Sequence, residues 1–197
     1  RMDSEIVMKT LYNKHYYDMT NWESIHIEAL VMERLTSSPR IADIYGHCGF
    51  SIMSEFLPFE LEEDSTWNDG MIQMNELNDD VNNEFSINEK LIISLSMAEA
   101  IADLHGFQDG VIVNNDIQLG QFLFTEDYKL KLNDFNRAEI MLFDEKLGKY
   151  CPYKNGVGDG NLRAPEEYKD EPLDEKIDIW SLGTNIYTLL TGLYVYF

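Results

Sequence analysis

The most apolar part of the chain, residues 182–197, contains no charged residue, although the protein as a whole is strongly charged. A helix needs roughly 20 apolar residues to span a bilayer, so this stretch is too short, and Gly183 and Gly192 interrupt it. We therefore expect a helix buried in a protein core and no membrane segment. Hydrophobic residues make up 44% of the sequence, enough for a sizeable core, which excludes wholesale disorder.

The charge and the cysteines exclude several kinds of partner and site. The chain has 15 Lys and Arg against 36 Asp and Glu, a net charge of −21. Nucleic acids and anionic membranes would repel such a surface. Two cysteines, Cys48 and Cys151, allow neither a disulfide framework nor a multi-cysteine zinc site. Residues 59–86 are rich in Asp and Glu and lack Lys and Arg. They are either a solvated loop or a docking surface for a basic partner.

Hydrophobic periodicity predicts a mixture of strands and helices. Apolar residues at helical spacing predict a helix over residues 22–35. Ser86 and Glu89 form a capping box that opens a second helix, and Gly106 ends it. A last helix is expected from Ile177 onward. Short apolar or alternating runs predict strands at residues 5–11, 41–46, 50–57, 111–113, 122–124 and 129–132.

Five short motifs follow one another along the chain, together with a glutamate in the first predicted helix. They are Val7-Met8-Lys9, Glu28, Asn114-Asn115-Asp116, Asn133-Asp134-Phe135-Asn136, Ala164-Pro165-Glu166 and Asp178-Ile179-Trp180-Ser181-Leu182-Gly183. In this order and at these separations they resemble the catalytic domain of eukaryotic-type protein kinases. They match, in turn, the lysine of the third strand, the αC glutamate, and the HRD, DFG, APE and DxWSxG motifs. Each motif alone is weak evidence for this resemblance, whereas the whole set in this order is strong evidence.

The resemblance implies an α+β, bilobal protein-kinase-like fold. A small, mostly β N-lobe would carry one helix, αC, and a larger C-lobe would be mostly helical. Residues 1–57 would form a partial N-lobe without the first two strands and the glycine-rich loop. Residues 58–197 would form a partial C-lobe, with the acidic insertion 59–86 and an activation segment at 134–166. The sequence thus resembles a kinase domain cut at both ends.

The resemblance also implies ATP and Mg²⁺ as ligands and assigns residues to them. Lys9 would bind the α- and β-phosphates, and Glu28 would hold Lys9 by an ion pair. Asp116 would accept or orient the proton of the substrate hydroxyl. Asp134 would bind Mg²⁺, with Gln121 as second ligand where the family has Asn.

The nucleotide base would lie between the two lobes. Val7 and Leu123 would sandwich the adenine, and Ser54 would be a small gatekeeper residue. Glu55 and Leu57 would offer backbone groups of the hinge.

Several motif positions depart from the family pattern. Asn114 and Asn115 replace the His and Arg of HRD, and Gln118 stands where a lysine often contacts the γ-phosphate. Asn136 replaces the DFG glycine, and we expect its backbone to adopt the left-handed conformation that Asn tolerates. The buried amide of Asn114 requires a hydrogen-bond partner.

The activation segment lacks the usual phosphorylation sites. No Ser or Thr occurs between Asp134 and Glu166, and Tyr150 and Tyr153 are its only hydroxyl-bearing residues. Together with Asn115, this predicts that Ser/Thr phosphorylation does not switch the segment.

Two functions remain open. One is a protein kinase that transfers the γ-phosphate of ATP to a Ser/Thr (or Tyr) hydroxyl of a protein, and the acidic surface would favour a basic protein as the substrate. The other is a pseudokinase acting as a nucleotide-binding or scaffold module. A small-molecule kinase and an acidic interaction domain without nucleotide are further alternatives.

Overall fold

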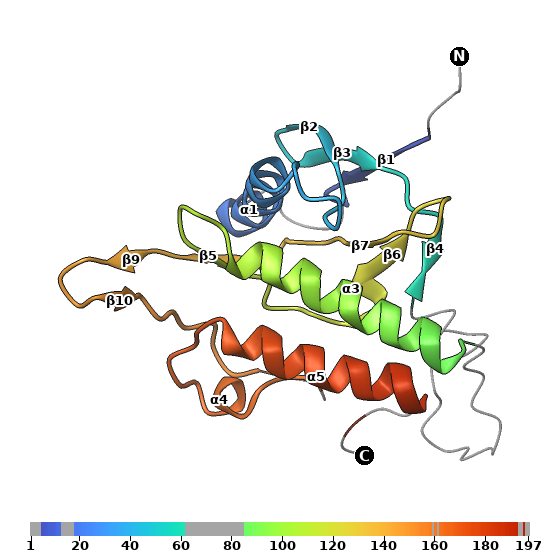
Figure 1. Ribbon diagram of the computed structural model, residues 1–197. Coiled ribbons are helices and arrows are strands. Elements are labelled where there is room, and N and C mark those ends of the chain that lie inside the picture. Colours follow the sequence, from blue (N-terminus) through green and yellow to red (C-terminus); the bar gives the residue numbers. More distant parts are fainter. Residues whose placement is uncertain are drawn as a thin grey trace.

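The computed structural model describes residues 5–12, 18–61, 85–158, 160, 162–192 and 195. An N-terminal layer of one sheet and one long helix lies against a larger part that contains two long helices and several short strands (Figure 1). The α+β class expected from the sequence is confirmed. Most of the acidic segment, residues 62–84, lies outside the described residues.

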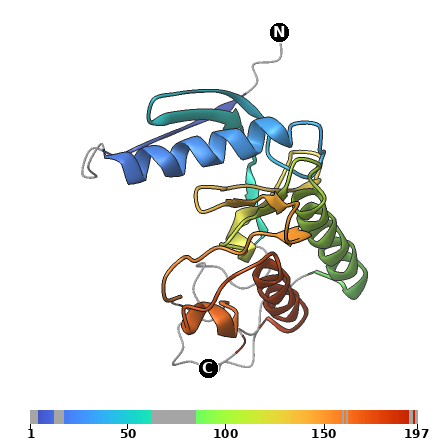
Figure 2. The same ribbon diagram turned by 90° about the vertical axis from the view of Figure 1, so that its left-hand side faces the viewer.

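The N-terminal layer is a three-stranded antiparallel sheet with a helix packed along it. The strands are β1 (Ile6–Thr10), β2 (Ile44–Cys48) and β3 (Ser51–Glu55), in the order β1-β3-β2. Helix α1 (Met19–Arg34) runs along this sheet, as Figure 2 shows. Ile25 and Ala29 of the helix pack with Ile52 of β3. This packing holds one face of α1 against the sheet and so fixes the orientation of the other residues of the helix.

Two boundaries differ from the sequence-based expectation for physical reasons. Helix α1 begins before residue 22, because the side chain of Asp18 accepts a hydrogen bond from the backbone N–H of Asn21 and caps the helix. Strand β2 begins at Ile44 instead of residue 41. The backbone of Arg40 and Ala42 bonds instead to Leu132, at 2.7 and 3.0 Å.

The larger part is built on two long helices that lie side by side (Figure 1). They are α3 (Ile87–His105) and α5 (Lys176–Thr191). The predicted capping box is present at the start of α3. Ser86 and Glu89 exchange side-chain-to-backbone hydrogen bonds of 2.7 and 3.4 Å. Helix α5 ends at Gly192, whose φ of 75° is left-handed and favours glycine.

Short strands and turns connect these helices. Strands β4 (Phe59–Glu60), β6 (Phe122–Phe124) and β7 (Leu130–Leu132) form an antiparallel sheet in the order β4-β6-β7. A 3₁₀ turn, η1 (Leu119–Gln121), precedes β6. The remaining elements are β5 (Val111–Val113), β8 (Glu139–Met141), β9 (Phe143–Asp144), β10 (Lys149–Tyr150) and the short helix α4 (Pro165–Tyr168).

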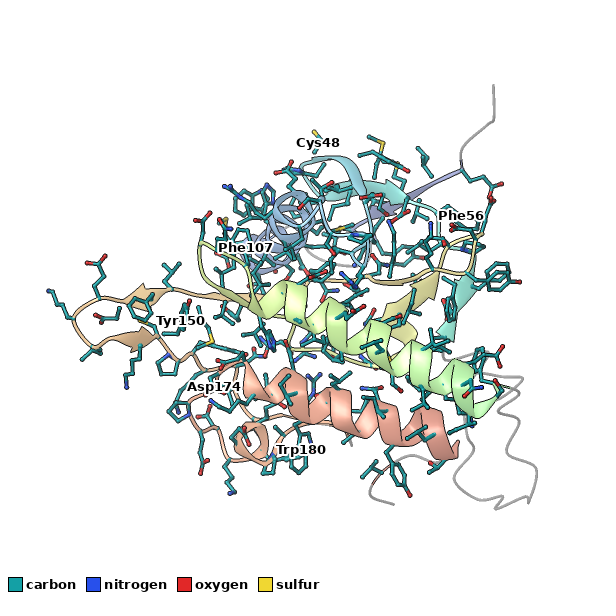
Figure 3. All side chains as sticks on the ribbon, in the orientation of Figure 1. Cys48, Phe56, Phe107, Tyr150, Asp174 and Trp180 are labelled. Carbon is teal, nitrogen blue, oxygen red and sulfur yellow. The ribbon has the colours of Figure 1, made fainter. Side chains whose placement is uncertain are left out.

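The pairing of these strands could not be foreseen from their patterns. Strand β5 pairs with β8, whereas β6 pairs with β4 and β7, so the neighbouring runs 111–113 and 122–124 belong to different sheets. Strands β9 and β10 form a hairpin that projects from the body of the molecule, and Tyr150 lies on it (Figure 3).

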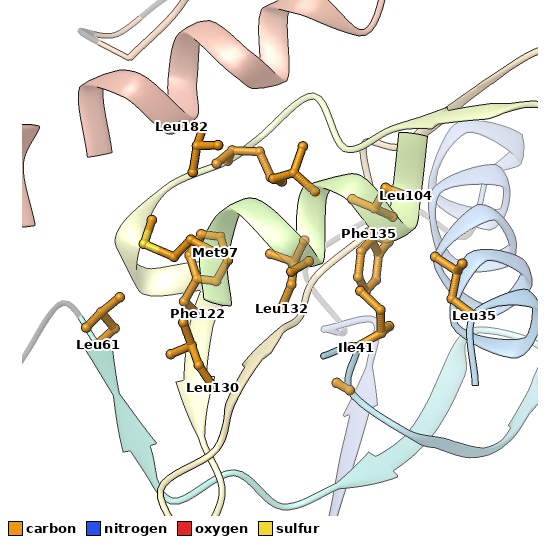
Figure 4. Packing of buried hydrophobic residues seen from close by; sticks show 14 of the residues in the cluster. Leu35, Ile41, Leu61, Met97, Leu104, Phe122, Leu130, Leu132, Phe135 and Leu182 are labelled. Atoms are coloured by element: carbon orange, nitrogen blue, oxygen red, sulfur yellow. The ribbon is translucent and has the colours of Figure 1, made fainter. Parts of the chain in front are cut away.

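The main core lies between α3, α5 and the short strands. Phe135 is fully buried beside Leu104 of α3 and Ile41 (Figure 4). Met97 and Phe122 fill the other end of the same cluster. The core therefore holds Phe135, the residue next to Asp134, in a fixed position.

Among the described residues, no helix is long and apolar enough to cross a membrane.

Candidate functional site

Three charged residues that are far apart in the sequence meet between the two parts of the molecule. Lys9 of β1 donates hydrogen bonds from Nζ to Glu28 Oε1 at 2.9 Å and to Asp134 Oδ1 at 2.8 Å. Glu28 lies on α1, and its side chain is 3% exposed. The expected ion pair between Lys9 and Glu28 is present, and Asp134 joins it.

The burial of this cluster shifts the protonation of its members. Burial opposes the charged form of Lys9, but Glu28 and Asp134 outweigh it, so the pKa of Lys9 lies above its ordinary value. For Glu28, burial outweighs the attraction of Lys9, and the pKa of this carboxyl is raised. Lys9 thus remains a cation at neutral pH.

The loop around Asp134 is held in an uncommon backbone conformation. Asp134 itself has a φ of 58°, in the left-handed region that favours glycine. The expectation that Asn136 would adopt this conformation is wrong, because the turn places it at Asp134. The N–H of Asn136 instead approaches Asp134 Oδ1 at 3.4 Å. The backbone N–H of Asn133 donates to the carbonyl of Gln121 at 2.9 Å, so Gln121 lies beside this loop.

A buried carboxylate of α5 fixes the loop that carries Asp116. Asp178 is 1% exposed and accepts hydrogen bonds from the backbone N–H groups of Asn114, at 2.8 Å, and Asn115, at 3.0 Å. The ring of His105 lies 3.1 Å from the same carboxylate. Because the carboxylate lies on a long helix, this loop is anchored to the core.

The side chain of Asn114 provides a link between the two loops. Its amide N–H donates to the carbonyl of Asp134 at 3.2 Å, and its carbonyl oxygen accepts from the N–H of Asp116 at 2.9 Å. The predicted need for a partner at this buried amide is therefore met on both sides. Asp116 and Asp134 are tied together through one asparagine.

Two contacts of the activation segment were not predicted from the motifs. Arg163, directly before the Ala164-Pro165-Glu166 motif, places Nη2 2.6 Å from Asp116 Oδ1. Tyr153 donates its hydroxyl hydrogen to the side-chain oxygen of Asn115 at 2.6 Å. The sequence signal that could have identified Arg163 is its positive charge next to the Ala164-Pro165-Glu166 motif, in a segment that must return to the Asp116 loop.

The residues expected to hold adenine lie along one strand pair and on β6. Val7 and Ser54 are direct neighbours in the antiparallel register of β1 and β3. Leu57 is 9% exposed, and Leu123 is half-buried on β6. The backbone N–H of Glu55 donates to the carbonyl of Asp43 at 3.0 Å, so that group is engaged within the protein.

The side chain of Glu55 belongs to a second charge cluster, in which Lys131 and Glu55 are mostly buried and Asp43 is 40% exposed. Lys131 of β7 places Nζ 2.5 Å from Glu55 Oε1 and 3.1 Å from Asp43 Oδ2. The Lys131 side chain is 10% exposed, and its two carboxylate partners outweigh the effect of burial, so its pKa is raised. This cluster connects the N-terminal sheet to the strand that leads to Asp134.

A family comparison agrees with this geometry. The model of the protein kinase domain matches residues 1–197 of the chain. The chain belongs to the protein kinase family. The small sheet with α1 and the larger helical part are accordingly the two lobes of a kinase domain.

Curated protein kinases are similar to this kinase domain over parts of its length. A putative serine/threonine-protein kinase of Acanthamoeba polyphaga mimivirus is 30% identical over 163 residues, which cover 80% of the chain and 28% of the relative. A probable serine/threonine-protein kinase of Dictyostelium discoideum is 32% identical over 97 residues, 49% of the chain and 22% of the relative. The chain thus spans less than a third of the length of either protein.

Proposed function

We propose that this kinase domain binds ATP with Mg²⁺ and transfers the γ-phosphate to a Ser, Thr or Tyr hydroxyl of a protein. The observation that carries the proposal is the position of Lys9 Nζ between Glu28 Oε1 and Asp134 Oδ1. Phosphoryl transfer depends mainly on positioning and on neutralising phosphate charge. A lysine held by one carboxylate beside another suits both needs.

At the nucleotide end, Lys9 would donate to the α- and β-phosphates while Glu28 keeps it in place. Val7, Ser54 and Leu123 would surround the adenine. Because the N–H of Glu55 already bonds to Asp43, hinge donation would fall to Leu57.

The metal would bind at Asp134, with Gln121 as a further ligand. Carboxylate and amide oxygens are hard donors of the kind that Mg²⁺ prefers, and Gln121 lies beside the Asp134 loop. Mg²⁺ held by these residues would offset the phosphate charge that develops during transfer. Lys9 would then release Asp134 to the metal and contact the phosphates instead.

In the transfer step, the substrate hydroxyl oxygen would bond to the γ-phosphorus as the bond from that phosphorus to the β,γ-bridging oxygen breaks. Asp116 would accept the hydroxyl proton, and ADP would leave with the bridging oxygen's electron pair. The net charge of −21 favours basic substrates through charge complementarity.

A second candidate function is a nucleotide-binding or scaffold module without transfer. Two residues favour it. Gln118 supplies no positive charge where the family often has a lysine against the γ-phosphate. Gln121 carries its amide one methylene further out than the Asn of the family.

The deciding experiment measures melting and phosphate transfer with the full-length protein. Mg·ATP at about 100 times its dissociation constant should add about 2.7 kcal/mol, a shift of a few degrees. Asp134→Asn should lose this shift, and Asp127→Asn, on an exposed turn, serves as matched control. Asp116→Asn should keep the shift and lose transfer. A shift without transfer to basic or acidic peptides would favour the nucleotide-binding module, and no shift at all would exclude the kinase and leave the scaffold.

A further inference from the structure

The guanidinium of Arg163 connects the Asp116 loop to the start of α4. Its Nη2 lies 2.6 Å from Asp116 Oδ1, and Nη1 donates to the backbone carbonyl of Asn115. Nη1 also lies 3.6 Å from Glu167 Oε1. One side chain therefore contacts the Asp116 loop at two points and the α4 helix at a third.

This cluster is largely withdrawn from solvent. The side chains of Arg163, Asp116 and Glu167 are 13%, 17% and 5% exposed. Glu167 is held in turn by the backbone N–H of Ala164, which donates to its Oε2 at 2.7 Å. Ion pairs with so little solvent contact are screened weakly, so the Arg163 contacts restrict the Asp116 carboxylate far more than a surface pair would.

The contacts of Asp116 are unequal at its two oxygens. Within the described residues, both neighbouring guanidinium groups approach Oδ1, Arg163 at 2.6 Å and Arg137 at 3.9 Å. Neither of these two guanidinium contacts involves Oδ2, which in the described part of the chain is the oxygen available to a hydroxyl group. Arginine suits this arrangement because its planar fork can serve a carboxylate and a carbonyl at the same time.

The position of Arg163 also matters because the Asp116 loop lacks the lysine that the family often has there. Gln118 follows Asp116 in the same loop and brings no positive charge. Arg163 approaches the same carboxylate from the activation segment. A cation is therefore present beside Asp116, although it comes from a different part of the chain.

We propose that Arg163 is a positioning residue for phosphate transfer, which orients Asp116 by holding Oδ1 and linking it to Glu167 at the start of α4. The inference rests on the proposed function. In this role Arg163 aligns Oδ2 with the substrate hydroxyl. Asp116 is then correctly placed only when the activation segment follows the path seen in the structure.

The test compares four variants of the full-length protein in steady-state transfer and in Mg·ATP binding. Arg163→Met should lower kcat about 10- to 100-fold and leave the dissociation constant of Mg·ATP unchanged, because a misplaced reacting group costs rate and the nucleotide contacts lie elsewhere. Arg163→Lys should recover kcat to within about 10-fold of the original, since it keeps the charge and loses the fork. Lys154→Met removes another activation-segment cation, paired with exposed Asp170, and serves as matched control.

The paired variant Arg163→Met/Glu167→Gln guards against a folding defect. It removes the buried Glu167 carboxylate that Arg163→Met leaves without its cation, so its melting temperature should lie closer to that of the original protein than that of Arg163→Met does, while kcat stays low. If kcat of Arg163→Met equals that of Lys154→Met, the inference is wrong and the proposed function stands. If the unaltered protein transfers no phosphate, the proposed function fails, and the positioning role fails with it.

Discussion

Tyr153 of the activation segment and Asn115 of the Asp116 loop are joined by a hydrogen bond of 2.6 Å between the phenol and the amide oxygen. The amide N–H of Asn115 donates to the carbonyl of Arg137 at 3.0 Å, so both ends of this side chain are used. The resemblance places an arginine at this position, which reads a phosphate. Here the corresponding link is neutral and needs no phosphate.

We expect Tyr153→Phe to lower the free energy of unfolding by about 1 kcal/mol, because Asn115 loses a largely buried partner. Burial raises the pKa of Tyr153, so its hydroxyl remains a donor at neutral pH. Limited proteolysis should cut residues 134–166 faster in this variant. Tyr150→Phe is the control, since Tyr150 lies on the projecting hairpin. Equal cleavage rates in both variants would contradict the prediction.

Removal of Lys131 should be far more costly than removal of Lys129 in the same strand region. Lys131→Met leaves Glu55 and Asp43 without their shared cation, and breaking such a buried pair costs about 3 kcal/mol. Lys129 and its partner Asp127 are mostly exposed, so Lys129→Met should barely change stability. Urea denaturation measures both, and similar midpoints would disprove the difference.

Stability should fall at alkaline pH. The pKa values of Lys9 and Lys131 are raised in the folded protein, so the folded state holds these protons more tightly than the unfolded state. Their contribution is fully present below the unfolded value of about 10.4 and is lost as the pH rises through the folded values. Unfolding free energies should therefore decline only above about pH 10, and decline less in Lys131→Met. A parallel decline in both proteins would show that Lys131 makes no such contribution.

Asp178→Asn should destabilise the domain by about 3 kcal/mol. The new amide would keep one accepting oxygen and turn its NH2 group toward the other of the two backbone N–H groups, those of Asn114 and Asn115, that now donate to the carboxylate. Asp174→Asn, next to the start of α5 and more exposed, is the matched control. Thermal melting distinguishes them, and equal midpoints would mean that the carboxylate does not anchor the loop.

The sequence predicted those elements whose signals are local. Helix α3 was found because its capping box and Gly106 mark both ends, and the family motifs located Lys9, Glu28 and Asp134. Strands β8 to β10 were missed, because each has only two or three residues and none is the wholly apolar run that marks residues 111–113 and 122–124. The left-handed conformation was assigned to Asn136 because this residue stands where the DFG motif has its glycine, whereas the tertiary turn requires it at Asp134.

The contacts of Arg163 were missed for a different reason. It is separated from Asp116 by most of the activation segment, and only the path of that segment brings them together. Motif matching considers positions with an assigned role, and the residue before Ala164 has none. The sequence showed that Gln118 brings no cation, but it did not show that Arg163 would lie beside Asp116.

The backbone bonds from Leu132 to Arg40 and Ala42 give the helix with Glu28 and the loop with Asp134 a common anchor. An inhibitor that requires α1 to swing outward would have to break the Lys9–Glu28 ion pair and pivot the helix about this anchor. A compact compound that fits beside Lys9 without moving the helix avoids that cost. Chemical probes for this domain are therefore best sought among ligands that accept the helix where it lies.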